Sequence, residues 1–124
     1  MMWIRESGWW LGFLIAGLVG FAFLAIHLGV FHLPGLLSGR PGSEVLSFPA
    51  AMERARSPST AASYIVLLGA LLYHGFYGLR GLLLELFPGR AARRAITWGA
   101  ALIGMAVFAY GTYTTAVAAR LAGG

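Results

Sequence analysis

The sequence predicts an all-α membrane protein with three transmembrane helices. Of its 124 residues, 59% are hydrophobic and only 10% are charged, which is more apolar surface than a soluble domain of this size could bury. Three apolar runs, at about 9–33, 61–87 and 95–119, reach the roughly 20 residues that cross a bilayer. None shows the alternation of a barrel strand, so each is expected to be a helix that satisfies its own backbone. We expect one membrane domain over residues 1–124.

The first run, 9–33, is predicted to be a retained span. Its apolar core of about 25 residues exceeds the roughly 7–15 of a secretion signal, and no small-residue cleavage site follows it. Trp3, Trp9 and Trp10 stand at its start, where aromatic residues of a membrane interface are expected.

Two histidines lie in this first run. Five residues on a helix turn through about 140°, so His27 and His32 are predicted not to bind one metal together. His27 has the small residues Gly20 and Ala16 on its side of the helix, which would leave room for a bulky ligand. His32 lies beside Pro34 at the end of the run and is expected to be a solvated interface residue.

Residues 34–60 are predicted to form a loop outside the membrane. Pro34-Gly35 and Arg40-Pro41-Gly42 are chain breakers. The stretch 48–56 alternates apolar and basic residues, so we expect either a short helix on the membrane surface or an ordinary solvated loop.

The second run, 61–87, contains the strongest functional signal, because ionisable residues at membrane depth are costly and commonly functional. At about 100° per residue, Gly78, Gly81 and Glu85 fall within about 40° of the direction of His74. A histidine above two positions without side chains suits a flat ligand such as haem, whose iron the imidazole would bind. The spacing also allows a helix packed through small residues, with His74 hydrogen-bonded to a carbonyl.

Arg80 lies about 120° around the helix from His74, from where its guanidinium could reach the rim of the same ligand. A haem propionate would be a suitable partner. An ion pair with Glu85 and snorkelling towards the interface are the alternatives. Glu85 lies about three residues before Pro88, where it could relay a proton to a quinone or simply end the helix beside Arg90.

The rise of about 1.5 Å per residue places His27 and His74 at depths that differ by about 10 Å. One haem could not easily take both as its axial pair. If both bind iron, they serve two haems, and each haem needs a second histidine from another chain. The chain has no cysteine, which excludes cysteine-ligated iron–sulfur clusters within it.

A turn at Pro88-Gly89 leads into the third run, 95–119, where Gly104 and Gly111 are seven residues apart on one side. This spacing predicts a face that packs closely against another helix.

The net charge of +5 comes wholly from arginine. In a membrane protein such charge indicates topology and lipid contact rather than a nucleic-acid surface. Arg90, Arg93 and Arg94 crowd the short second connection, so that side is predicted to be cytoplasmic, together with the N-terminus and Arg5.

The second run resembles a known family. Its pattern is histidine, three residues, glycine, one residue, arginine, and an acid eleven residues after the histidine, here His74, Gly78, Arg80 and Glu85. This pattern resembles the histidine-containing helix of the membrane-anchor subunits of succinate dehydrogenase and fumarate reductase. Residues 53–58 resemble the Arg-x-x-Ser-Pro element that precedes that helix. The chain lacks the Ser-x-x-His-Arg element that opens the larger, C-type anchor, so it resembles the smaller, D-type chain.

The resemblance implies a non-catalytic subunit of a succinate:quinone oxidoreductase in the inner (cytoplasmic) membrane. Its three helices would form half of a helical bundle completed by a C-type anchor, with an iron–sulfur subunit and a flavoprotein subunit docked against it. By resemblance, His74 would be an axial ligand of haem b and His27 would serve a second haem. Electrons would pass to quinone close to the iron–sulfur subunit.

One position departs from the family pattern. The D-type chain often has a tyrosine after the acid to bind quinone, and here that position is Leu86, which leaves Glu85 as the candidate of this chain. Two other functions fit the residues: a haem-free anchor of a similar complex, and a small transporter or channel subunit with Glu85 and Arg80 on an ion path.

Overall fold

A computed structural model describes residues 2–123, and side chains from residue 7 onward. Every regular element among these residues is helical. Three helical stretches are long and apolar enough to cross a membrane, namely Ser7–Leu37, Pro58–Leu86 and Arg90–Gly123. The all-α fold with three spans is therefore confirmed. The first and third helices extend beyond both ends of the runs predicted for them, whereas the second begins three residues before the run 61–87 and ends one residue before its end. The side chains of Trp3 and Arg5 lie outside the described residues.

The first span consists of three consecutive segments: α1 (Met2–His27), a π-helical turn (Leu28–His32) and α2 (Leu33–Leu37). The prediction that Pro34-Gly35 breaks the helix is wrong. A proline ring normally collides with the carbonyl four residues earlier, but here the preceding turn is widened, with the Leu33 amide bonded to the Leu28 carbonyl. Pro34 then stands in the first turn of α2, where a proline is tolerated.

The connection between the first two spans turns sharply and then forms two short helices. Gly39 has φ 68°, and the chain leaves this turn for α3 (Gly42–Val45) and α4 (Phe48–Ala55). The Ser47 hydroxyl accepts a hydrogen bond from the Ala50 amide at 3.4 Å and caps α4. Of the two expectations for residues 48–56, the short helix is confirmed.

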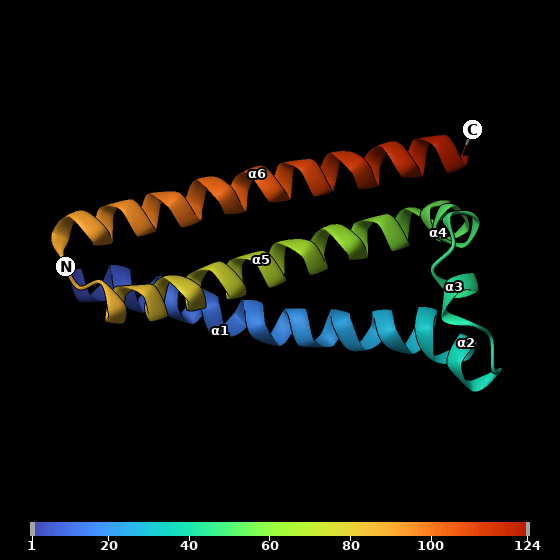
Figure 1. The fold of residues 1–124 in the computed structure, drawn as a ribbon, viewed down its shortest axis with the longest axis horizontal. Helices are drawn as coiled ribbons and strands as arrows, with labels where there is room; N and C mark the ends of the chain where they lie inside the picture. The colour runs from blue at the N-terminus through green and yellow to red at the C-terminus, as the bar shows by residue number, and fades with distance from the viewer. Residues whose placement is uncertain (1, 124) are drawn as a thin grey trace.

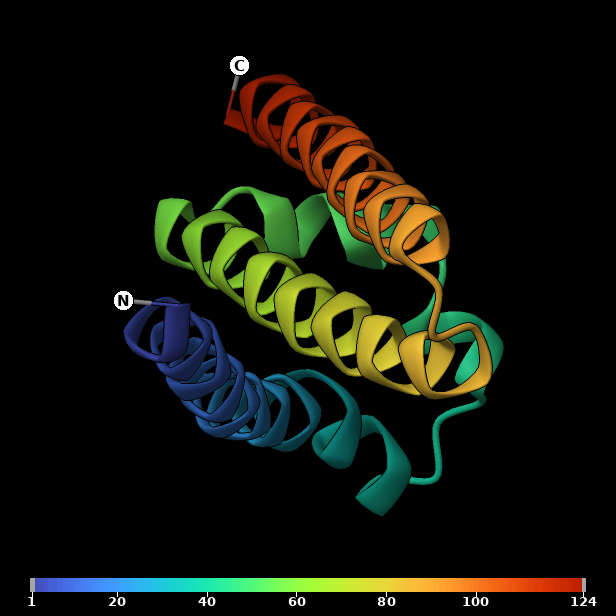
Figure 2. The ribbon, with the colours of Figure 1, turned by 90° about the vertical axis from the view of Figure 1, so that its left-hand side faces the viewer.

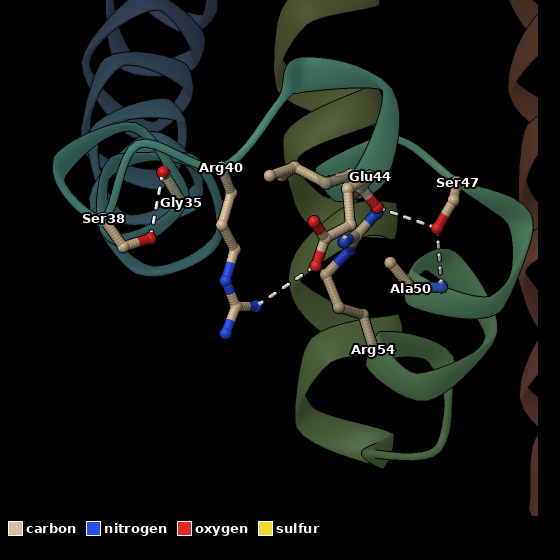
Figure 3. Close-up of polar contacts among 8 residues, drawn as sticks. Gly35, Ser38, Arg40, Glu44, Ser47, Ala50 and Arg54 are labelled. Atoms are coloured by element: carbon tan, nitrogen blue, oxygen red, sulfur yellow. Dashed lines mark hydrogen bonds and ion pairs between the residues drawn. The ribbon is translucent and has the colours of Figure 1, made fainter.

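Polar contacts hold this connection together (Figure 3). Arg54 donates a hydrogen bond to the Val45 carbonyl at 3.0 Å, which ties α4 to the end of α3. Arg40 forms an exposed ion pair with Glu44 at 3.9 Å, and an exposed pair of this kind contributes at most about 1 kcal/mol. Backbone geometry and the Arg54 contact therefore set the path of the loop more than the surface charges do.

We expect Gly39→Ala to destabilise this connection by about 1 kcal/mol, because the left-handed conformation costs an L-residue roughly 1–2 kcal/mol. Gly42→Ala is the matched control: both glycines have open space around the position of a Cβ, and only Gly39 has a positive φ. The measurement is the rate of limited proteolysis of the loop in membranes. Equal rates for the two variants would contradict this reading.

The three long helices stand in a row with α5 (Pro58–Leu86) in the middle. α1 and α6 (Arg90–Gly123) pack against opposite sides of α5 (Figures 1 and 2). The start of α1 and the turn at 87–89 lie at one end of the helices, and the 38–57 connection and the end of α6 lie at the opposite end (Figure 1). A row, unlike a closed bundle, leaves both of its faces uncovered.

This open arrangement encloses almost no core. Among residues 7–123, only Gly20, Gly35 and Ala55 are buried, while Leu18 and Phe21 expose 70% and 73% of their surface. Apolar side chains exposed to this extent are stable against lipid tails or against the helices of another subunit. The fold is therefore that of a membrane protein whose faces are completed from outside.

Glycines bring α5 and α6 close together. A Cβ on Gly104 would lie 3.5 Å from the Phe76 ring, and Gly111 lies so close to Leu68 that a side chain there would force a shift. The close-packing face predicted for the third span is confirmed, and its partner is α5.

Candidate functional site

His74 lies close to the middle of the second span. The midpoint of α5 (Pro58–Leu86) is residue 72, so His74 is displaced from it by about 3 Å along the axis. Its Nδ1 lies 3.0 Å from the carbonyl oxygen of Phe13 on α1, and its ring stacks on the Phe13 ring at 4.2 Å with 6° between the planes. Two separate contacts with α1 therefore orient the imidazole.

The hydrogen bond to Phe13 decides the tautomer of His74. A carbonyl oxygen can only accept, so Nδ1 carries the proton, and in the neutral imidazole the lone pair is then on Nε2. Nε2 makes no hydrogen bond within the described part of the chain. This is the arrangement in which a histidine binds a metal through Nε2 while its other nitrogen is held by a carbonyl. The carbonyl contact expected from simple packing is thus present, and it leaves Nε2 without a hydrogen bond within the described part of the chain.

The glycines around His74 do different things. Gly17 on α1 lies directly against the imidazole, because a Cβ there would be 2.7 Å from Nδ1. Gly78 is covered by α1, since a Cβ there would meet the Phe13 ring at 3.4 Å, whereas Gly81 faces open space. The strip predicted to be clear below His74 is therefore filled from within the chain at Gly78 and open at Gly81. Glu85, at the same end of α5, is exposed.

Arg80 faces the other neighbour of α5. Its Nε donates to the Thr97 hydroxyl of α6 at 2.8 Å, and its guanidinium lies 5.9 Å from the centre of the Tyr77 ring. The alternative of an ion pair with Glu85 is not formed among the described residues, whose ion pairs are those of Arg40 and Arg56. The structure thus places Arg80 towards α6 and His74 towards α1.

A cavity of about 970 Å³ lies between α5 and α6, and Arg80 and Thr97 are on its wall. His74 does not line it. Sequence reasoning did not predict this cavity. The available signal was the set of small residues Ala100, Ala101 and Gly104 on the third span, which leaves space beside aromatic residues of α5.

His27 belongs to a separate cluster at the C-terminal end of α1, on the side of the 38–57 connection (Figure 1). Its Nε2 lies 3.2 Å from Nε2 of His32. The predicted separation of about 140° between the two residues is therefore wrong, and so is the ground for predicting that they could not serve one metal together. The π-helical turn is the reason: its hydrogen bonds join residues five apart and bring such residues nearly into line. His27 Nδ1 is buried without a partner among the described residues.

The surroundings of His27 set its depth. The centre of its ring lies 5.2 Å from the centre of the Tyr64 ring on α5. Tyr64 is ten residues before His74 on the same helix, so the two imidazoles stand at levels about 15 Å apart. Gly20, predicted to leave room beside His27, packs on Leu71, where a Cβ would be 3.2 Å from the leucine side chain. No cluster of three or more His, Cys, Asp or Glu side chains capable of holding a metal occurs within the described residues. An iron centre here needs ligands from outside the chain.

Tyr73, the residue before His74, also joins α5 to α1. Its hydroxyl donates a hydrogen bond to the Trp9 carbonyl at 2.9 Å. We expect Tyr73→Phe to lower the free energy of unfolding by about 0.6 kcal/mol, the average for a hydrogen bond between membrane helices. Tyr113→Phe is the matched control, because Tyr113 is 66% exposed and makes no hydrogen bond among the described residues. Unfolding in SDS, followed by tryptophan fluorescence, measures the difference. An equal loss in both variants would show that the Tyr73 bond contributes nothing.

Three membrane-spanning helices in an open row, with an oriented imidazole at mid-membrane, define an integral membrane protein that works within a larger assembly. The chain is 30% identical over 104 residues to the succinate dehydrogenase hydrophobic membrane anchor subunit of Archaeoglobus fulgidus, a match that covers 84% of this chain and 83% of that protein. It belongs to the family of succinate dehydrogenase membrane anchor subunits. No protein-family model and no solved structure matches the chain.

Proposed function

We propose that this chain is the smaller, D-type anchor of a succinate:quinone oxidoreductase and contributes half of its membrane bundle. The observation that supports this is the open row of α1, α5 and α6, which leaves both faces apolar and uncovered. A C-type anchor with helices of its own would cover one face and complete the bundle.

The end of the helices that carries the 87–89 turn is the proposed docking end for the iron–sulfur and flavoprotein subunits. Arg90, Arg93 and Arg94 are exposed there, and at the other end Arg40 and Arg56 are paired with Glu44 and Glu53. A dense arginine cluster at a short connection between two spans favours the cytoplasmic side. The N-terminus would then lie in the cytoplasm, with the protein in the inner (cytoplasmic) membrane.

We infer that His74 is an axial ligand of haem b. The Phe13 carbonyl holds Nδ1–H, the Phe13 ring holds the plane of the imidazole, and Nε2 is left to bind iron. The chain supplies one ligand at this level, so the second histidine would come from the C-type anchor. When bound, haem b would carry single electrons between the iron–sulfur subunit and quinone. Arg80 has no part in this proposal, because it faces α6.

Two finer proposals concern residues at the two opposite ends of the helices. A second haem at His27 requires its Nε2 to turn away from His32, since the two nitrogens are 3.2 Å apart. Glu85 is the group of this chain proposed to serve quinone, because it is exposed one residue before the end of α5 at Leu86. From there a carboxylate can exchange protons with water and with a quinone held by a neighbouring subunit.

The test is the reduced-minus-oxidised absorbance spectrum of the purified complex that contains this chain, with haem and iron quantified per copy. Two b-type haems per copy would support ligation by both His74 and His27. One haem would leave His74 as the ligand and His27 as part of a hydrogen-bonded pair. Quinone reduction without any haem absorbance would overturn the haem proposal and favour a haem-free anchor of the same complex.

A further inference from the structure

The cavity between α5 and α6 has the form of an apolar groove. Its walls carry Phe76 from α5 and Met105 and Phe108 from α6, and Ala101 and Gly104 leave the space between them. Met105 is 70% exposed, so the groove is open to the surroundings of the protein. We refer to it as the α5–α6 groove.

One charged residue, Arg80, lines the α5–α6 groove within the described part of the chain. Its Nε donates a hydrogen bond to Thr97, so the two terminal nitrogens of the guanidinium remain available to bind another group. No carboxylate of residues 7–123 forms an ion pair with it. An arginine inside a membrane span needs a counter-charge, so the molecule that fills this groove should carry an anion.

The position of Arg80 matches the border between lipid tails and headgroups. Arg80 is eight residues from the α5 midpoint at residue 72, or about 12 Å along the axis, and half of the hydrocarbon layer is about 15 Å. A guanidinium on its flexible stem can reach the headgroup level from there. Trp98 lines the same groove, and tryptophan is enriched at this depth.

The length of the groove matches one leaflet. It follows α5 from Arg80 to Gly69, eleven residues or about 16 Å, which is close to the roughly 15 Å that the acyl chains of one leaflet span. A bound molecule with an anionic head at Arg80 and an apolar tail of this length fits both ends of the groove.

We propose that the α5–α6 groove binds an anionic phospholipid, with its phosphate on Arg80 and an acyl chain along the groove towards Gly69. No histidine is among the described residues that line the groove, so a haem there would lack an imidazole from this chain. The head of a quinone carries no anionic group to pair with Arg80. This site is separate from the one proposed around His74 and does not depend on it.

The first experiment measures lipid binding to the purified complex. The complex is equilibrated in nanodiscs of phosphatidylglycerol and phosphatidylcholine and re-extracted, and retained lipids are counted by native mass spectrometry. Arg80→Gln is expected to remove one phosphatidylglycerol per copy and to lower the preference for that lipid about fivefold, which corresponds to roughly 1 kcal/mol per charge near a membrane surface. Arg120→Gln, which removes an exposed charge of α6 outside the groove and away from the proposed docking end, is expected to change neither. Equal losses in both variants, or none, would overturn the proposal.

A second pair of variants tests the apolar part while Arg80 is kept. Ala101→Trp fills the groove, and Ala106→Trp places the same side chain on an exposed position of α6 that does not line it. We expect the first to displace the bound lipid and the second to retain it. Retention in Ala101→Trp would contradict the placement of the acyl chain.

A photo-crosslinker identifies the occupant in the native membrane. With benzoylphenylalanine in place of Met105, which lines the groove and is 70% exposed, in the whole complex, irradiation is expected to give a phospholipid adduct of this chain. An adduct with a transmembrane helix of another subunit would mean that protein fills the groove, and would overturn the proposal.

Discussion

Replacing His74 with alanine is expected to remove one low-spin b-type haem from each copy of the assembled complex. The signal of that haem should fall at least about tenfold, because changes to outer contacts of a metal ligand already cost 10–100-fold in affinity. The absorbance spectrum of the reduced complex, with haem counted per copy, gives the result. If two haems are present, the one that depends on His27 should remain, since the two imidazoles stand at levels about 15 Å apart.

A second substitution separates iron binding from packing. The alanine variant also loses the hydrogen bond to the Phe13 carbonyl and the stacked ring, so misfolding alone would lower the haem content. His74→Asn keeps an N–H that can donate to that carbonyl and has no nitrogen in the place of Nε2. We expect a folded complex without this haem. A His74→Asn complex that keeps its full haem content would show that His74 does not bind iron.

The second large effect is expected at Gly17, where α1 meets the His74 ring. A Cβ at this position would be 2.7 Å from Nδ1, so Gly17→Ala must move the imidazole or push the helices apart. Overpacking of this kind costs about 1–3 kcal/mol. Gly75→Ala is the matched control, because a Cβ there meets nothing within 4 Å, and alanine favours a helix by about 1 kcal/mol over glycine. Unfolding in SDS should therefore give changes of opposite sign.

A double-mutant cycle tests whether the effect passes through His74. Once His74 is alanine, the ring that a Cβ on Gly17 would strike is gone. The cost of Gly17→Ala should then fall by most of its value, because residues in direct contact are not additive. An unchanged cost in the His74→Ala background would show that Gly17 is constrained by the backbone of α5 and not by the imidazole.

The membrane-spanning segments could be read from the sequence because their length is a property of the chain alone. An apolar run long enough to cross the hydrocarbon has one stable solution, a helix. The structure confirms all three runs, with helix ends that differ from them by one to five residues, because the end of a helix is not fixed by the length of its apolar run. The family was also visible in the sequence, since the His74, Gly78, Arg80 and Glu85 spacing lies within one helix.

The directions of side chains between helices could not be read in this way. An ideal helix places Arg80 within reach of the space beside His74. The helix packed on that side is α6, however, and the Nε of Arg80 donates a hydrogen bond to Thr97 there. Gly78 was predicted to clear space, yet Phe13, 65 residues earlier in the chain, occupies its surface. These contacts depend on which helix lies on which side of α5.

The sequence by itself determined that this is a three-helix membrane protein with an imidazole at mid-membrane, because hydrophobic length and helical spacing are local quantities. Only the three-dimensional structure decided that His27 meets His32 and that Arg80 faces a groove. The first depends on a π-helical turn that changes the angle between residues five apart. The second depends on the order of the helices in the row, which is set by contacts between segments far apart in the chain.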